Sequence, residues 1–273
     1  MILFRTSWLV GLITPLFALV FNTDCFGHDL WLIPPELAKV NIPFTIRAHS
    51  GMEFPISVHA PNPNQFTRRF VILPDGKETA LVARGKEELS GLLDYTPNRP
   101  GIYIAAVTTE PKLITLSAEE FNHYHVADGL PHIYLMRHKE SALGQPGRER
   151  YSKSPKTLLQ VGDGKEGNPC RTVGLPLEIV PLRNPFQLKV CETLPVKVLF
   201  DQRPLADAHL GWDVPGDGEE PSGTVRTNAK GEALIPISQT GLMTIRLTHM
   251  TRAKAADYDW ESFWTTLTFR IPK

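Results

Sequence analysis

The stretch "PGIYIAAVTTEP", residues 100–111, decides the fold class of this sequence. It is rich in β-branched and aromatic residues and is closed by proline at both ends, a pattern typical of a β-strand. A second stretch, "TGLMTIRLTHM" at residues 240–250, is similar, because each is a strand-like run opened by glycine. The pair forms a weak internal repeat and favours a chain built from two related β units.

Further strand-like runs lie on both sides of these two stretches and are separated by turn sequences. The runs are "FTIRAH" (44–49), "RRFVILP" (68–74), "LPVKVLF" (194–200), "AHLGWDV" (208–214), "EALIPIS" (232–238) and "FWTTLTFRI" (263–271). The turns include "PDGK", "PNRPG", "DQRP" and "NAKG", and the 24 prolines and 20 glycines of the chain fit a fold with many turns. The sequence therefore predicts a mainly β chain of two tandem immunoglobulin-like β-sandwiches.

A different pattern separates the two halves. "LSAEEFNHYHVADGL" (116–130) begins with a capping box, Ser117 and Glu120, and predicts a short helix that ends before Gly129. "GRERYSKSPKTLLQVG" (147–162) predicts a second helix, interrupted at Pro155. We therefore expect an N-terminal β-sandwich over residues 28–114, a helical insert and linker over 115–170, and a C-terminal immunoglobulin-like sandwich over 171–273.

Residues 1–27 have the pattern of a signal peptide. Arg5 precedes the apolar run "SWLVGLITPLFALVF", and the small residues Cys25 and Gly27 occupy the positions that a signal peptidase reads. An uncleaved membrane anchor is the alternative, but the apolar run is short and contains Pro15. We expect cleavage after Gly27, a mature chain that begins with His28, and a periplasmic or secreted location.

Charge and cysteine content limit the classes of partner. Lysine plus arginine equals aspartate plus glutamate, 29 against 29, so no overall field attracts nucleic acid. Cys170 and Cys191 remain after cleavage, and an even pair in an oxidising compartment favours a disulfide between them, with two buried free thiols as the alternative. The basic run at 148–156 is explained by a solvated face or by interdomain salt bridges.

Four segments carry a resemblance to a known family. They are "HDLWLIPP" (28–35), "GRERYSKSPKTLLQVG" (147–162), "GLPLEIVPLRNPFQL" (174–188) and the closing "THM…DYDWESFWTTLTF" (248–269). In this order they resemble the NikM-like secreted bacterial proteins. The resemblance implies a periplasmic component of cobalt and nickel uptake, which would work with a membrane transporter or an acceptor protein.

His28 is the first candidate metal ligand, because cleavage after Gly27 makes it the amino terminus. An amino-terminal histidine offers an α-amine and the imidazole Nδ1 to one ion, and a third nitrogen from elsewhere completes a histidine brace. Tetragonal nitrogen coordination suits copper(II) best, with nickel and cobalt behind. The α-amine loses its proton readily near a cation. The alternative is that His28 is a polar residue at a frayed terminus.

His249 is the partner that strand alternation and the resemblance favour, since it shares a strand face with Met243, Ile245 and Leu247 and matches the family's "HM" segment. Glu261 is expected to supply an oxygen ligand or to accept a hydrogen bond from an imidazole. His49 is a weaker candidate at a strand end. The remaining histidines, which rank lower, are His59 in a proline-rich loop, and His123, His125, His132 and His138 around the predicted helix.

The sequence has no nucleophile elbow, phosphate-binding loop, dinucleotide fingerprint or His-Glu-x-x-His zinc motif. Three hypotheses follow, in this order. The first is a periplasmic protein that carries or delivers nickel, cobalt or copper through an N-terminal histidine site. The second is a non-catalytic interaction or scaffolding protein of two sandwiches, and the third is a copper oxidoreductase with a histidine brace.

Overall fold

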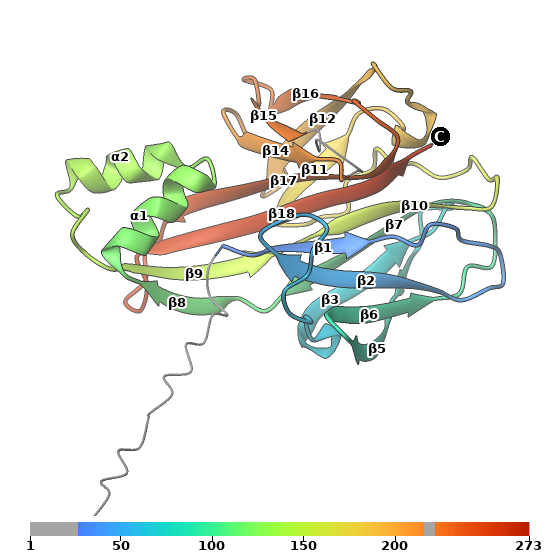
Figure 1. Cartoon of the computed structure of the whole chain (residues 1–273), viewed down its shortest axis with the longest axis horizontal. Coiled ribbons are helices and arrows are strands. Elements are labelled where there is room, and N and C mark those ends of the chain that lie inside the picture. The colour runs from blue at the N-terminus through green and yellow to red at the C-terminus, as the bar shows by residue number, and fades with distance from the viewer. Residues whose placement is uncertain (1–26, 216–221, 273) are drawn as a thin grey trace, which may run out of the picture.

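A computed structural model describes residues 27–215 and 222–272 and shows a mainly β chain (Figure 1). The predicted signal peptide, apart from Gly27, lies outside the described residues. Within the described ranges the strands form three sheets, which we call the N-terminal, central and C-terminal sheets. Their strand orders and bounds follow.

The N-terminal sheet has the order β1 (Asp29–Ile33), β2 (Phe44–Gly51), β6 (Ser90–Tyr95) and β5 (Val82–Glu87). The central sheet has the order β15 (Ser222–Arg226), β14 (His209–Asp213), β17 (Gly241–Arg252), β18 (Trp260–Ile271), β10 (Lys156–Val161), β7 (Gly101–Thr109), β3 (Phe66–Ile72) and β4 (Glu78–Ala80). It also contains β9 (Gly147–Lys153), which pairs with β18, and β8 (Lys112–Leu116), which pairs with β9. The C-terminal sheet has β11 (Leu177–Pro181), β12 (Thr193–Phe200) and β13 (Arg203–Pro204), with β16 (Glu232–Pro236) also on β12. Short 3-10 turns are η1 (Pro63–Gln65) and η2 (Pro185–Gln187).

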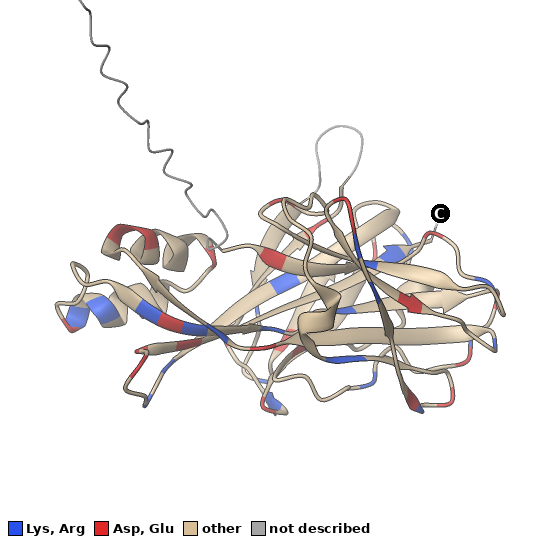
Figure 2. Cartoon of the chain, turned by 90° about the horizontal axis from the view of Figure 1, so that it is seen from below, with Lys and Arg blue, Asp and Glu red and all other residues tan. Residues whose placement is uncertain are grey.

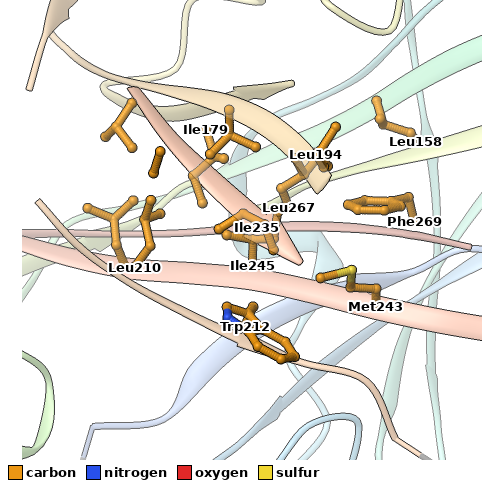
Figure 3. Close-up of a cluster of buried hydrophobic side chains, with 14 of the residues drawn as sticks. Leu158, Ile179, Leu194, Leu210, Trp212, Ile235, Met243, Ile245, Leu267 and Phe269 are labelled. Carbon is orange, nitrogen blue, oxygen red and sulfur yellow. The ribbon is translucent and has the colours of Figure 1, made fainter. Parts of the chain in front are cut away.

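The alternation of side chains along the central sheet divides the hydrophobic core in two. Tyr103 of β7 and Val71 of β3 face the N-terminal sheet, whereas Ile104 and Phe70 face the C-terminal sheet. Figure 3 shows the second cluster, in which Trp212 and other central-sheet side chains meet the C-terminal sheet. The predicted mainly β class and the helices of the insert are confirmed. The two halves are joined rather than arranged in tandem, because strands from both halves and β10 from the predicted linker lie in the central sheet. The two sandwiches share the central sheet, one against each of its faces.

The insert contains α1 (Ala118–Ala127) and α2 (Pro131–Lys139), which lie together at one end of the molecule (Figure 1). The capping box forms as predicted: the Glu120 amide donates to Ser117 Oγ at 3.3 Å, and the Ser117 amide donates to the Glu120 carboxylate at 2.9 Å. Phe121 and Tyr124 pack against Trp260 and other apolar residues of the central sheet. This packing fixes α1 on the end of β17 and β18.

The helix predicted at 147–162 is wrong, because this stretch forms β9 and β10 instead. Pro155 separates the two strands, and both run parallel to β18. Side chains in β9 alternate: Arg148 and Arg150 pair with the acidic residues Asp259 and Glu261, while the glutamate between the arginines is buried. These salt bridges account for the two arginines of the basic run, and its Lys156 pairs with Glu178.

Charge is distributed without a dominant sign. Figure 2 shows basic and acidic segments interspersed along the described part of the chain, in agreement with the balanced composition. Among residues 27–215 and 222–272, no helix is long and apolar enough to cross a membrane.

Candidate functional site

His28 is held where the N-terminal sheet meets the central sheet. The next residues form β1, which pairs with β2 and also lies across β18. The hydroxyls of Thr266 and Thr268 donate to the carbonyls of Leu30 and Leu32, so the start of the chain is fixed to its last strand. The Lys153 ammonium group donates to the carbonyl of His28 itself. His28 is therefore an anchored residue rather than a frayed end.

His59 lies next to His28, although it comes from a different part of the chain. Its loop is held by the Ser57 hydroxyl, which accepts from the Ser50 amide at 3.0 Å and lies 2.9 Å from the His59 carbonyl and 2.7 Å from the Leu89 carbonyl. The rings of His28 and His59 have centroids 5.5 Å apart and planes inclined by 39°. The loop thus presents a second imidazole to the expected amino terminus.

Both histidines line a cleft with a volume of about 480 Å³. Its walls come from the β1 end, the loop that carries His59, β8, β9, α1 and β18. Besides the two histidines, the polar and aromatic lining includes Lys86, Glu110, Lys112, Tyr124, Glu149, Tyr151, Lys153 and Trp264. Tyr124 stacks on Trp264 with centroids 5.7 Å apart, which closes the side of the cleft under α1. The cleft is large enough to admit solvent and small solutes to the histidine pair.

Buried ionisable groups surround the cleft. Burial raises the pKa of Glu149 to about 7, although its carboxylate accepts hydrogen bonds from Ser262 and Tyr124. Burial also lowers the pKa of Lys153 to about 8, against the opposing effect of nearby carboxylates, and raises the pKa of Asp128 to about 7. Perturbed pKa values of this kind cluster at functional sites, and charged networks within folds also produce them.

His249 does not meet His28 in the structure. It pairs with Phe263 in the β17–β18 register, and its ring packs on Phe200 with centroids 4.5 Å apart. These residues face the C-terminal sheet, whereas the β18 threonines that bind β1 point to the opposite face of the central sheet. Strand alternation placed His249 on the inward face of its strand, and that face belongs to the other sandwich. Burial lowers the pKa of its imidazole to about 4.

The other predicted ligands have structural partners. The carboxylate of Glu261 pairs with Arg150 on β9. The two ring nitrogens of His49 lie 3.0 Å from the Pro55 carbonyl and 2.9 Å from the Ser90 hydroxyl. The structure therefore brings neither Glu261 nor His49 to the histidine pair.

The predicted disulfide is wrong, since Cys170 and Cys191 are both free. Cys170 precedes β11 and lies near Lys156, and Cys191 lies two residues before β12, at the opposite end of the antiparallel β11–β12 pair. The length of these strands separates the two thiols.

The nitrogen groups at the cleft fit a copper or nickel ion only in part. Two imidazoles on one ion have centroids roughly 4.5–6.5 Å apart, because metal–nitrogen bonds are about 2.0–2.1 Å long, and the 5.5 Å between His28 and His59 lies in this range. In the described ranges no group of three or more His, Cys, Asp or Glu side chains could hold a metal ion. A site with three nitrogen ligands would therefore need a further group, and a chain that begins at His28 would offer its α-amine.

The local sequence of His59, "SVHAPNPN", shows only a proline-rich loop and gives no sign of a ligand. His59 is placed beside His28 by the isolated β-bridge between Ser50 and His59 and by the hydrogen bonds of the Ser57 hydroxyl. Both contacts depend on tertiary structure. No periodicity in the sequence reports such a contact.

Comparison with known proteins identifies the family of the chain. The chain belongs to the family described as "Domain of unknown function (DUF4198)", whose model matches residues 25–251. No curated protein matches the sequence. Among solved structures, the "D0-D1 domain of Intimin" is similar at 10% identity and a TM-score of 0.20, over 89% of this chain and 97% of that one. A likeness at that score carries no argument about fold or function.

Proposed function

We propose that this protein, cleaved after Gly27, is a periplasmic or secreted metal-binding protein that carries or delivers copper, nickel or cobalt. Its ligands are the α-amine and imidazole of His28 and the imidazole of His59. The observation that carries the proposal is the proximity of the two rings in an open cleft, at the residue where the sequence pattern predicts the new amino terminus. The resemblance to the NikM-like proteins supports transport of the ion to a membrane transporter or an acceptor protein.

The nature of the ligands orders the metals. Three nitrogen donors in a tetragonal arrangement favour copper(II), followed by nickel(II) and cobalt(II). When bound, the ion would take its nitrogen ligands in their deprotonated forms, so binding should weaken as the pH falls. The chain's own contribution is to hold His28 through Lys153 and the β1–β18 contacts, and to hold His59 through Ser57.

The test compares a chain that begins at His28 with the same chain whose α-amine is acetylated. Each is titrated with copper(II), nickel(II) and cobalt(II) by calorimetry, and the copper complexes are examined by electron paramagnetic resonance. We expect one tight site in the first chain and at least about tenfold weaker binding when the amine is acetylated or when His59→Ala is introduced, because each change removes a ligand nitrogen. Equal affinities in all three proteins would reject the histidine site and leave a non-catalytic interaction module as the better hypothesis.

A copper oxidoreductase is the second candidate. The observation that favours it is the aromatic lining of the cleft by Tyr124, Tyr151 and Trp264, which gives a substrate a surface to pack on. Copper-loaded protein that consumes oxygen with ascorbate faster than an equal amount of free copper would favour this reaction over transport. Consumption at or below the free-copper rate would favour a carrier.

A further inference from the structure

The carboxylate of Asp128 has no direct partner, unlike its acidic neighbours. Within the described part of the chain its side chain has no hydrogen bond or salt bridge, and Arg246 and Lys153 act on it only at longer range. By contrast, Asp29 lies 3.6 Å from Arg246, and Glu149 accepts from two hydroxyls. Partly buried carboxylates are costly without a partner. Asp128 therefore has an unused capacity to bind a cation.

Asp128 is held firmly in its place. It caps the C-terminal end of α1, and its amide donates to the Tyr124 carbonyl at 2.9 Å. The following residue, Gly129, has φ +71° and contacts the ring of His209 so closely that a Cβ there would lie 2.1 Å from it. Because Tyr124 also stacks on Trp264, the end of the helix cannot shift without breaking several contacts.

The place where Asp128 is held is the expected cleavage site. One oxygen of its carboxylate lies 3.6 Å from the position that a Cβ would take on Gly27, whose carbonyl forms the peptide bond with His28. The carboxylate is therefore next to the bond whose cleavage would create a new α-ammonium group. Before cleavage the same nitrogen is an uncharged amide.

The position of Asp128 at a helix C-terminus strengthens this reading. The C-terminal end of a helix carries partial negative charge from its free carbonyl groups, so an aspartate there is unfavourable and a cation is favourable. A residue that is unfavourable for its local structure and has no compensating contact indicates a functional role. A positive charge at this spot would be stabilised both by the carboxylate and by the helix end.

We propose that Asp128 is the binding site for the α-ammonium group of His28 in the cleaved protein. The inference rests on the proposed cleavage after Gly27 and deepens the proposed function, because it names the residue that fixes the amine beside the His28–His59 pair. Asp128 is a positioning residue in this scheme. Maturation then forms an ion pair that joins the first residue of the chain to the helical insert.

The experiment is a double-mutant cycle on metal-free protein. Thermal unfolding is measured in EDTA at pH 7 for chains that begin at His28 with a free or an acetylated α-amine, each with Asp128 or with Asp128→Asn. We expect Asp128→Asn to lower the Tm by at least about 3 °C more in the chain with the free amine, because acetylation turns the charged amine into an uncharged amide. Glu119→Gln, which removes a charge from the opposite end of α1, is the matched control and should act equally in both chains.

Equal losses from Asp128→Asn in both chains would overturn the inference. If that variant does not fold, the wild-type chains with free and with acetylated α-amines are compared at low salt and in 1 M NaCl. A Tm advantage of the free amine that shrinks with salt supports the ion pair, and a zero or salt-independent difference refutes it. EDTA keeps metal out of the measurement, so the inference can fail while the metal titrations succeed, and the reverse also holds.

Discussion

The buried ion pair between Lys156 and Glu178 allows a quantitative test of what joins the shared central sheet to the C-terminal sheet. The Lys156 ammonium lies 2.6 Å from the carboxylate, and the two side chains are 1% and 0% exposed. The same carboxylate also accepts hydrogen bonds from the amides of Val173, Gly174 and Leu175 at 2.9, 3.1 and 3.3 Å. Glu178 is thus the single acceptor for four donors.

We predict that Glu178→Leu destabilises the fold by about 3–5 kcal/mol, because it leaves a buried ammonium group without a partner. For a chain of this size this corresponds to a Tm lower by roughly 6–20 °C. Lys156→Met should cost less, since the carboxylate keeps its three amide donors. The double variant should recover only part of the loss, because each orphaned amide still costs about 1–3 kcal/mol.

The measurement is urea unfolding at pH 7, followed by fluorescence and circular dichroism. Lys197→Met is the matched control, because its salt bridge with Glu232 is 3.8 Å long and about one-third exposed, and such pairs contribute about 0–1 kcal/mol. A cost below about 1 kcal/mol for Glu178→Leu, or a larger cost for Lys156→Met, would refute the assignment of Glu178 as the central acceptor.

Three further predictions concern His249, His125 and the two cysteines. His249→Ala should leave metal affinity unchanged in titrations while lowering stability, because the ring packs on Phe200 away from the cleft. His125→Phe should reduce the stability that the protein loses between pH 7 and pH 4 in acid unfolding. Burial lowers the pKa of His125 from 6.5 to about 3, so below pH 6.5 the unfolded chain binds a proton that the folded chain does not bind. An unchanged dependence of stability on pH would contradict this prediction. Denaturation of a chain that begins at His28, without reductant, should expose two reactive thiols to a thiol reagent, and fewer would show a disulfide.

Much of the fold could be predicted from local patterns. The eight strand-like runs coincide with β2, β3, β7, β12, β14, β16, β17 and β18, because alternation and β-branched content report directly on side-chain burial. The capping box at Ser117 predicted the start of α1 for an equally local reason. Strand β9 was missed because its arginines pair with residues more than a hundred positions away, such as Asp259 for Arg148. In β10 the charge of Lys156 is buried against Glu178 of another sheet, which no local pattern shows.

The candidate site was predicted only at His28. His28 could be predicted because its position after the expected cleavage site is visible in the sequence. The neighbours of His28 depend on which face of the sheet a strand presents and on how a loop is held. For this reason His59, and not the expected His249, lies next to His28. Asp128 carried no motif at all, and only the end of α1 and its approach to Gly27 distinguish it.

The hydroxyl of Thr266 and the carbonyl of Leu30 are 236 residues apart in sequence and 2.8 Å apart in space, and this contact sets an order of events. A chain is synthesised from its amino terminus, so β1 emerges first and β18 last. The support for His28 on the central sheet cannot exist until the last strand has been made and has inserted between β17 and β10. His28 is therefore synthesised long before the cleft can form, and a chain truncated before Trp260 would never form the cleft.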